Sequence, residues 1–387
     1  MNSIPLGNMS LDTFLAEYWQ QKPLLIRQGI PNFVSPLTGE ELAGLSCEQN
    51  IESRLIINRQ KSNTWELIHG PLGNSVFTNL PNSHWTLLVQ AVDHWIPQAA
   101  QILERFNFIP RWRIDDLMMS YSSNGGGVGP HFDYYDVFLV QAQGERLWEI
   151  GGSYDDQAEI KENLPVKILK DFNPTDAWTL EAGDILYLPP GIGHNGIAQT
   201  DECITCSVGY RTPSHTDILR EFTDYIGEQL TESQRYQDPD LKLQVNAGEI
   251  SDLTIDKLQH ILDHYIHDKD SIRQWFGRYI TTPKYHTDHQ VENNIHSSQL
   301  KAHLESGGLI HRNESSKFAF LSKNNSYLLF VDGELFATEI QSNDLVALLC
   351  SEITFSKEKF KLTDENLALL ETLFNCGALY LPEPSSN

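Results

Sequence analysis

The feature that most constrains the fold is a series of short β-type segments within residues 113–211. These segments are rich in Val, Ile, Phe, Tyr and Trp, and turn-forming Gly, Pro, Asn and Asp residues separate them. Short strands at regular spacing, joined by turns, are typical of an antiparallel sandwich or barrel. The sequence therefore predicts a β domain of this kind in this part of the chain.

Helical patterns precede this segment. Ser10 is a residue type that caps helix N-termini, and the apolar residues after it recur at helical spacing as far as Trp19. Residues 24–26 form a short apolar run, which predicts a buried strand. A second helix is predicted from Trp85 to about Phe106, because apolar residues recur there every three or four positions.

The remaining sequence predicts two further parts. Amphipathic helices are expected at about 214–230 and 252–279, and the polar, His-rich stretch 281–298 is the best linker candidate. Beyond it, short helices and a hairpin that turns at Val331-Asp332-Gly333 fit a winged-helix-like domain. The elements expected in this last part are a helix at 299–305, strands at 317–322 and 327–332, helices at 344–350 and 364–374, and a strand at 378–381.

The charge of the chain bears on its partners. Its 387 residues include 52 acidic and 28 basic ones, a net charge of −24. Nucleic-acid binding needs clustered Lys and Arg, so this charge argues against sequence-specific nucleic-acid binding and favours a basic partner. No apolar run reaches the ~20 residues that span a bilayer, the N-terminus lacks signal-peptide features, and five scattered cysteines form no disulfide framework. These features predict a cytoplasmic protein without membrane contact.

The most informative stretch is residues 125–133, Gly-Gly-Gly-Val-Gly-Pro-His-Phe-Asp. In a strand, residues two apart face the same side, so His131 and Asp133 can converge on one metal ion. His194, which follows a Pro-Pro-Gly turn well downstream, would complete a 2-His-1-carboxylate facial triad. Such a triad leaves three neighbouring positions for a bidentate oxo-acid and dioxygen. A lone His-x-Asp is usually an exposed pair on a strand, but two barrel-type segments that carry all three ligands favour the metal site.

A second element strengthens this interpretation. Arg146 and Trp148 share one face of a strand that follows the metal segment after one further strand. The fixed fork of guanidinium donors suits the distal carboxylate of 2-oxoglutarate, held beside an aromatic wall. Without the triad, Arg146 would be read as part of a surface ion pair. With the triad, we expect it to bind the cosubstrate.

These residues resemble a known family. The arrangement His131-Phe-Asp133, Arg146 and His194 is similar to that of JmjC-type double-stranded β-helix oxygenases. Longer stretches are similar to the bacterial ribosomal oxygenases, which hydroxylate an arginine in the sixteenth protein of the large ribosomal subunit. Those stretches are residues 18–27, 115–120, 125–131, 136–141 and 187–191.

The resemblance covers the whole chain and implies an α+β fold in three parts. Residues 1–212 would form a JmjC (cupin) oxygenase domain with the double-stranded β-helix. Residues 213–280 would form a helical dimerisation domain, and residues 281–387 a winged-helix-like domain. The expected assembly is a homodimer.

The resemblance also implies roles for individual residues. His131, Asp133 and His194 would bind Fe(II) and act in catalysis. Arg146 matches the position that binds the C5 carboxylate of 2-oxoglutarate, where many JmjC relatives have Lys. Ser120 matches a family hydroxyl that also contacts this cosubstrate.

Two further assignments depend on position in the sequence. Cys203 and Cys206 lie in a strand, where a spacing of three places them on opposite faces, so they are expected to pack rather than bind metal. Thr205 or Ser207 then faces the pocket, and we assign Thr205 to the cosubstrate site. An arginine substrate needs a carboxylate partner near the metal, and Asp136 has the best sequence position to provide one.

The sequence thus predicts an Fe(II)- and 2-oxoglutarate-dependent dioxygenase that hydroxylates an arginine of a basic large-subunit ribosomal protein. One alternative is a related enzyme that hydroxylates a ribosomal histidine or demethylates lysine. Another is a non-catalytic cupin-type binding protein, and a third is a nucleic-acid regulator that uses the winged-helix domain. His260, His264 and His267 form a helical stripe, which we interpret as solvated because apolar residues occupy the other side of that helix.

Overall fold

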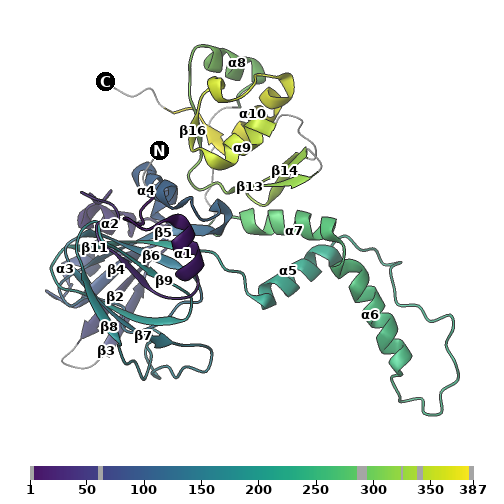
Figure 1. Cartoon of the computed structure of the whole chain (residues 1–387), viewed down its shortest axis with the longest axis horizontal. Coiled ribbons are helices and arrows are strands. Elements are labelled where there is room, and N and C mark those ends of the chain that lie inside the picture. The colour runs from purple at the N-terminus through teal and green to yellow at the C-terminus, as the bar shows by residue number, and fades with distance from the viewer. Residues whose placement is uncertain (1–3, 60–63, 286–293, 324–325, 338–342, 383–387) are drawn as a thin grey trace. The chain divides into compact units, whose positions relative to one another are not determined.

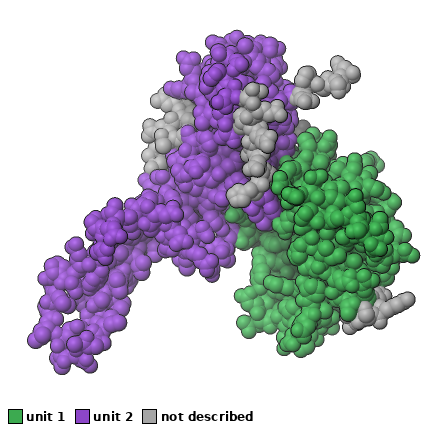
Figure 2. All heavy atoms as spheres, turned by 180° about the vertical axis from the view of Figure 1, so that it is seen from behind, with its two compact units in different colours: residues 1–212 green, residues 213–387 purple. Residues whose placement is uncertain are grey.

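The computed structural model describes residues 4–59, 64–285, 294–323, 326–337 and 343–382. Its internal contacts divide the chain into two units, residues 1–212 and 213–387, which Figure 2 shows in green and purple. The second unit contains both the predicted helical domain and the predicted winged-helix-like domain. Residues 286–293 of the expected linker, with His286 and His289, lie outside the described residues.

The first unit contains two antiparallel sheets, as predicted for an antiparallel sandwich (Figure 1). The larger sheet has the strand order β1-β9-β6-β11-β5-β4-β2-β3, and the smaller one has the order β10-β7-β8. The strands are β1 (Leu24–Ile26), β2 (Ser53–Arg59), β3 (Thr64–His69), β4 (Trp85–Val89), β5 (Ile114–Ser122), β6 (Val137–Gln143), β7 (Arg146–Ser153), β8 (Asp176–Leu180), β9 (Ile185–Leu188), β10 (Ile192–Ala198) and β11 (Cys203–Tyr210).

The two faces of the larger sheet bury different sets of side chains. On one face, Leu117 and Met119 of β5 join a large apolar core with residues of the helices α1 (Leu11–Glu17), α2 (Gly39–Leu45) and α4 (Pro97–Leu103). The short helix α3 (Asn74–Thr78) packs against the same core. On the other face, side chains of β6 and β9 meet those of the smaller sheet in a separate apolar cluster. Because strand residues alternate, Ser120 and Ser122 face the space between the two sheets.

The helix predicted from Trp85 to Phe106 is wrong in its first part. Trp85–Val89 is strand β4, followed by the short 3₁₀ turn Val92–His94, helix α4 and a second 3₁₀ turn at Glu104–Phe106. A further 3₁₀ turn, Arg111–Arg113, precedes β5. Side chains on both faces of β4 are buried, so all its residues except Thr86 are apolar. Such a run cannot be distinguished from a buried helix by periodicity alone.

The second unit begins with three helices rather than two: α5 (His215–Gly227), α6 (Asp252–Ile266) and α7 (Lys269–Thr281). The side chain of Asp268 accepts a hydrogen bond from the Asp270 amide and caps α7, which breaks the helix predicted at 252–279. No helix in the described ranges is long and apolar enough to cross a membrane.

The last part of this unit has the helices and wing expected of a winged-helix domain (Figure 1). Three strands, β13-β14-β15, form the wing, and a second small sheet has the order β16-β12-β17. The elements are α8 (Ser297–Glu305), β12 (Ile310–Arg312), β13 (Phe318–Lys323), β14 (Ser326–Val331), β15 (Glu334–Ala337), α9 (Asn343–Ser351), β16 (Thr354–Phe355), a 3₁₀ turn (Lys357–Lys359), α10 (Asp364–Asn375) and β17 (Leu379–Tyr380).

Candidate active site

The His-x-Asp segment pairs with the start of β10. His131 and His194 exchange two backbone hydrogen bonds, with N–O distances of 3.0 and 2.8 Å, and the amide of Gly191 donates to the Asp133 carbonyl at 2.7 Å. The predicted strand at 131–133 is therefore a single β-bridge in an extended segment. Side chains around the bridge alternate as they do in a strand. This one backbone pairing therefore brings the side chains of both histidines next to each other.

The three predicted metal ligands are together. Asp133 Oδ2 lies 3.8 Å from His131 Nε2 and 3.6 Å from His194 Nε2, and one ligand atom from each residue lies within 4.8 Å of the others. Atoms at these separations can all reach one ion at the ~2 Å that metal–nitrogen and metal–oxygen bonds require. His194 is buried, whereas His131 and Asp133 are partly exposed, so the site opens on one side.

Both histidines are oriented as metal ligands by backbone carbonyls. His131 Nδ1 lies 2.9 Å from the Gly129 carbonyl oxygen, and His194 Nδ1 lies 2.9 Å from that of Ile192. A carbonyl accepts only, so each Nδ1 carries the proton and each Nε2 presents its lone pair to the site. Burial, together with the nearby His131, lowers the pKa of His194 to about 4, which keeps this ring neutral and ready to bind a cation.

Two glycines allow the metal-binding segment to approach β10. A Cβ atom on Gly127 would lie 2.3 Å from the carbonyl oxygen of Gly196, so the backbones meet too closely for a side chain. Gly129 has a φ of +83°, which L-residues rarely adopt. The glycine run thus serves the approach of two backbones.

Arg146 lies in the interior between the two sheets. Its side chain is 4% exposed, and its Nη2 donates to Ser122 Oγ at 2.8 Å. Within the described residues, its Nε and the indole Nε1 of Trp148 are buried without a hydrogen-bond acceptor. The Trp148 ring lies 5.8 Å from the guanidinium carbon and 5.8 Å from the His194 ring. Buried donors without an acceptor, next to a metal triad, fit an anionic cosubstrate such as 2-oxoglutarate.

Ser120 and Thr205 lie side by side on the inner face of the large sheet. They are partners in the β5–β11 register, and both are buried. Thr205 Oγ1 donates to Gln141 Oε1 at 3.1 Å. Their roles in cosubstrate binding remain predictions, which this inward orientation supports.

Sequence reasoning missed Ser122, the residue that contacts Arg146. Ser122 also shares a hydrogen bond of 3.0 Å with Thr86, on the neighbouring strand. Strand parity could have identified Ser122, because it lies two residues beyond Ser120 on the same face. Thr86 lay within the region wrongly predicted as a helix, so its place in the sheet could not be inferred.

Asp136 does not lie where a substrate could reach it. Its side chain has no exposed surface, and it accepts hydrogen bonds from Tyr187 Oη at 2.6 Å and Gln20 Nε2 at 2.9 Å. Arg113 Nη2 lies 3.2 Å from the same carboxylate and compensates its charge. The structure therefore corrects the assignment of Asp136 to the substrate: this carboxylate ties the start of β6 to β9 and to the residues after α1.

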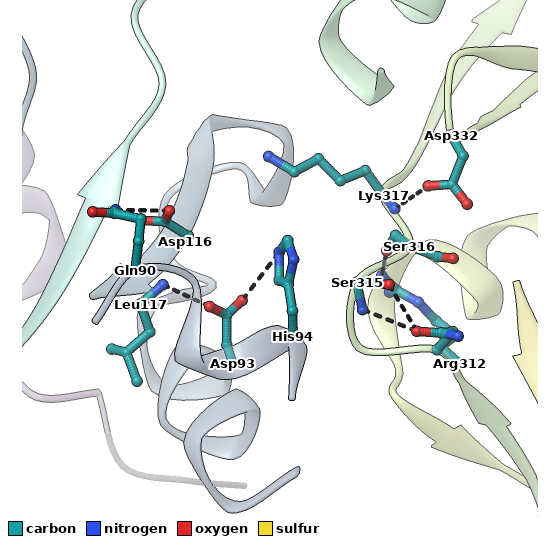
Figure 3. A network of polar contacts seen from close by, with 11 residues as sticks. Gln90, Asp93, His94, Asp116, Leu117, Arg312, Ser315, Ser316, Lys317 and Asp332 are labelled. Atoms are coloured by element: carbon teal, nitrogen blue, oxygen red, sulfur yellow. Dashed lines mark hydrogen bonds and ion pairs between the residues drawn. The ribbon is translucent and has the colours of Figure 1, made fainter. Parts of the chain in front are cut away.

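A different carboxylate lies on the inner face of β5. Asp116 is buried, and Gln90 Nε2 lies 3.1 and 2.9 Å from its two oxygens, as Figure 3 shows. Burial of its hydroxyl and the charge of the neighbouring Asp133 raise the pKa of Tyr135 well above its ordinary value.

The chain is similar to known proteins along most of its length. Residues 101–218 match the JmjC domain, and residues 260–380 match the ROXA-like winged helix. The ribosomal protein uL16 3-hydroxylase of Escherichia coli is 36% identical over 278 residues, which cover 71% of this chain and 72% of that protein.

Solved structures of E. coli YcfD are similar to the whole fold. One has a TM-score of 0.89 and 31% identity, covering 97% of this chain and 99% of that one. Another, described as a ribosomal oxygenase in complex with cobalt and 2-oxoglutarate, has a TM-score of 0.85 and 31% identity, covering 96% of this chain and 98% of that one. By this identity and coverage, and with the JmjC domain and winged helix that it contains, the chain belongs to the ribosomal oxygenase family.

Proposed function

We propose that this protein is an Fe(II)- and 2-oxoglutarate-dependent dioxygenase that hydroxylates an arginine of uL16, a basic protein of the large ribosomal subunit. The observation that carries the proposal is the triad of His131, Asp133 and His194 with a buried, incompletely bonded Arg146 nearby. We infer the substrate, uL16, from the similarity to the uL16 3-hydroxylase. Because that substrate is a ribosomal protein, we place the reaction in the cytoplasm.

The protein's own residues would hold and orient the reactants. The triad would hold the iron, and Arg146 with Ser122 would fix the distal carboxylate of 2-oxoglutarate in the interior between the sheets. Bound iron supplies oxygen activation coupled to decarboxylation of 2-oxoglutarate to succinate and CO₂, and thereby the oxidising power to hydroxylate a C–H bond. Trp148 and the apolar cluster behind it exclude water from this space.

The experiment that tests the proposal combines two measurements. Mass spectrometry of ribosomal proteins from cells with and without this protein should show a gain of one oxygen, about 16 Da, on one uL16 arginine. Purified protein with Fe(II), 2-oxoglutarate and uL16 should form succinate in step with that modification. Succinate formed with a ribosomal histidine peptide and none with uL16 would favour the histidine hydroxylase. No metal-dependent succinate with any ribosomal protein would favour a binding protein.

The guanidinium of the substrate needs a carboxylate partner. Asp116 is the candidate because, unlike Asp136, it faces the space between the two sheets. Asp116 faces the interior from β5, and Gln90 donates a hydrogen bond to its carboxylate. We expect Asp116→Asn to raise the KM for uL16 roughly 10- to 100-fold, as loss of a charge-assisted hydrogen bond does, with iron and 2-oxoglutarate binding unchanged. Initial rates at varied uL16 concentration measure this effect.

The matched control for this prediction is Asp115→Asn, because the neighbouring side chain lies on the opposite face of β5. It should leave the KM for uL16 unchanged. A uL16 peptide with Lys in place of the target arginine should be a poor substrate, since Lys lacks the planar fork of donors. An unchanged KM in Asp116→Asn would show that another residue binds the guanidinium.

We further propose that α6 and the segment before it form part of a homodimer interface. No residue of α6 is buried, and within the second unit Figure 1 shows other described helices only near its C-terminal end, where Tyr265 packs against residues of α5 and α7. Its apolar side is exposed, and Leu243 and Val245 of the preceding segment are fully exposed. The exposed apolar residues of α6 are Leu253, Ile255, Leu258, Ile261, Leu262 and Ile266.

A second copy of the chain is the partner that best fits this surface. It presents the same apolar face, so a two-fold axis buries both faces at once. We expect the wild-type protein to sediment as a dimer and the Leu258→Asp/Leu262→Asp protein to sediment as a monomer. The control His260→Asp, on the other side of α6, should remain dimeric. A wild-type protein that sediments as a monomer at micromolar concentration would contradict this prediction.

A further inference from the structure

Arg54 lies on the inner face of the large sheet, in line with the proposed cosubstrate residues. The strand registers pair Thr205 with Ser120, Ser120 with Leu88, and Leu88 with Arg54. Residues paired across neighbouring antiparallel strands point to the same face. Arg54 therefore faces the same side as Ser120 and lies two strands, about 10 Å, away from it.

The guanidinium of Arg54 makes no hydrogen bond, ion pair or ring contact within the part of the chain that the structure describes. Several other arginines of this unit are paired. Arg59 binds Glu66, Arg113 binds Asp136, and Arg146 binds Ser122. Arg54 as a residue is half-buried, but none of its guanidinium nitrogens is fully covered, so these five donors can be reached by an acceptor. Such a side chain is placed to bind an acceptor that comes from outside.

Arg54 shares the inner face of the large sheet with an acidic residue of β5. That face has a carboxylate, Asp116, and a guanidinium, Arg54. A cationic substrate side chain is attracted by the first group and repelled by the second, so the two must contact different parts of a substrate.

We propose that Arg54 binds a main-chain carbonyl oxygen of the substrate peptide next to the target residue. This inference rests on the proposed function and names the part of the substrate that Arg54 recognises. A basic ribosomal peptide brings few carboxylates, and every residue of it brings a carbonyl acceptor. While Asp116 binds the arginine head group, Arg54 holds the backbone from which that side chain extends.

The first test separates substrate binding from turnover. We expect Arg54→Ala to raise the KM for the hydroxylated uL16 peptide roughly 10- to 100-fold, with kcat and the KM for 2-oxoglutarate unchanged. Arg54→Lys should give an intermediate KM, because it keeps the charge and loses the fork. The Tm of both variants should match that of the wild type, since Arg54 makes no hydrogen bond to the rest of the protein. The control is Arg59→Ala, an exposed arginine at the end of the same strand.

The second test identifies the atom that Arg54 contacts. Peptides in which a single carbonyl near the target residue is replaced by a thioamide, a weaker acceptor, should show one position at which the wild-type KM rises. With Arg54→Ala, the same replacement should have no additional effect, as expected when two changes remove one interaction. Additive effects at every position would overturn the inference.

The outcomes distinguish this inference from the function on which it rests. Turnover of uL16 with an unchanged peptide KM in Arg54→Ala, or a raised KM for 2-oxoglutarate alone, would overturn the role of Arg54 and leave the proposed function standing. Absence of uL16 hydroxylation by the wild-type protein would remove the proposed function and this inference with it.

Discussion

Replacing Asp133 by alanine should abolish hydroxylation of uL16 and weaken Fe(II) binding by more than about 100-fold. Even residues that only orient metal ligands cost 10- to 100-fold in metal affinity, and Asp133 is the negatively charged member of the triad. Its oxygen lies 3.6 and 3.8 Å from the two histidine nitrogens, so it completes the site for both. Metal titration of the apo-protein, followed by intrinsic fluorescence or calorimetry, and succinate formation measure the two effects.

Asp133 is the best ligand to change, because its side chain is partly exposed while that of His194 is buried. The Asp133→Ala protein should therefore remain folded, which its thermal unfolding would show. Asp171→Ala, the loss of an exposed acid in the connection between β7 and β8, serves as the control and should leave both measurements unchanged. Fe(II) binding of wild-type strength in Asp133→Ala would show that the metal lies elsewhere.

The metal ligands could be predicted from the sequence because side chains two residues apart point to the same side even where the backbone is extended without forming a regular strand. His131 and Asp133 are not in a regular strand, yet the single bridge between His131 and His194 keeps both on one side. A spacing of two residues and a Pro-Gly turn before the third ligand are local signals, so the prediction did not depend on the strand order. The absence of a side chain at Gly127 lets the segment before His131 come close to the backbone of β10.

Asp136 shows where such reasoning fails. Proximity in sequence to the metal ligands suggested a place in the pocket, but the direction of a side chain after a turn depends on what packs around it. Tyr187, Gln20 and Arg113 come from three distant parts of the chain and form a buried polar site for this carboxylate. No local sequence pattern predicts that these three residues surround Asp136. In contrast, the alternation of side chains along β5 is a local pattern, and it places Asp116 on the inner face.

The error at β4 has a related cause. Apolar residues on both faces of a central strand reflect burial on both sides, and a helix that is buried all round has the same composition. The sequence therefore contained no signal that Thr86 lies beside Ser122. The hydrogen bond between Thr86 and Ser122, the residue that contacts Arg146, could not be predicted. For α6 the sequence correctly indicated an amphipathic helix with one apolar side. Its periodicity does not indicate whether the partner of that side belongs to the same chain.

Arg146→Ala should raise the KM for 2-oxoglutarate roughly 100-fold or more, while Fe(II) affinity stays close to that of the wild type. The guanidinium is buried, and removing one partner of a buried hydrogen-bonded charge pair costs about 2–5 kcal/mol, or roughly 30- to several-thousand-fold in binding. Arg146 is bonded to Ser122 and makes no hydrogen bond to the triad in the described structure, so the metal ligands should keep their geometry. Succinate formation at varied 2-oxoglutarate, and Fe(II) titration without it, measure the two affinities.

Two further variants decide between loss of the guanidinium and loss of packing. Arg146→Lys should restore part of the affinity, since an ammonium provides charge and donors without the bidentate fork. Ser122→Ala removes the hydroxyl that holds Nη2 and should raise the KM for 2-oxoglutarate by a smaller factor, because the charge stays in place. Arg59→Ala, which changes an exposed ion pair of the same unit, should have no effect. A KM for 2-oxoglutarate that is equal in Arg146→Ala and the wild type would show that another residue binds the distal carboxylate, and the unpaired donors of Arg146 and Trp148 would then need a different ligand.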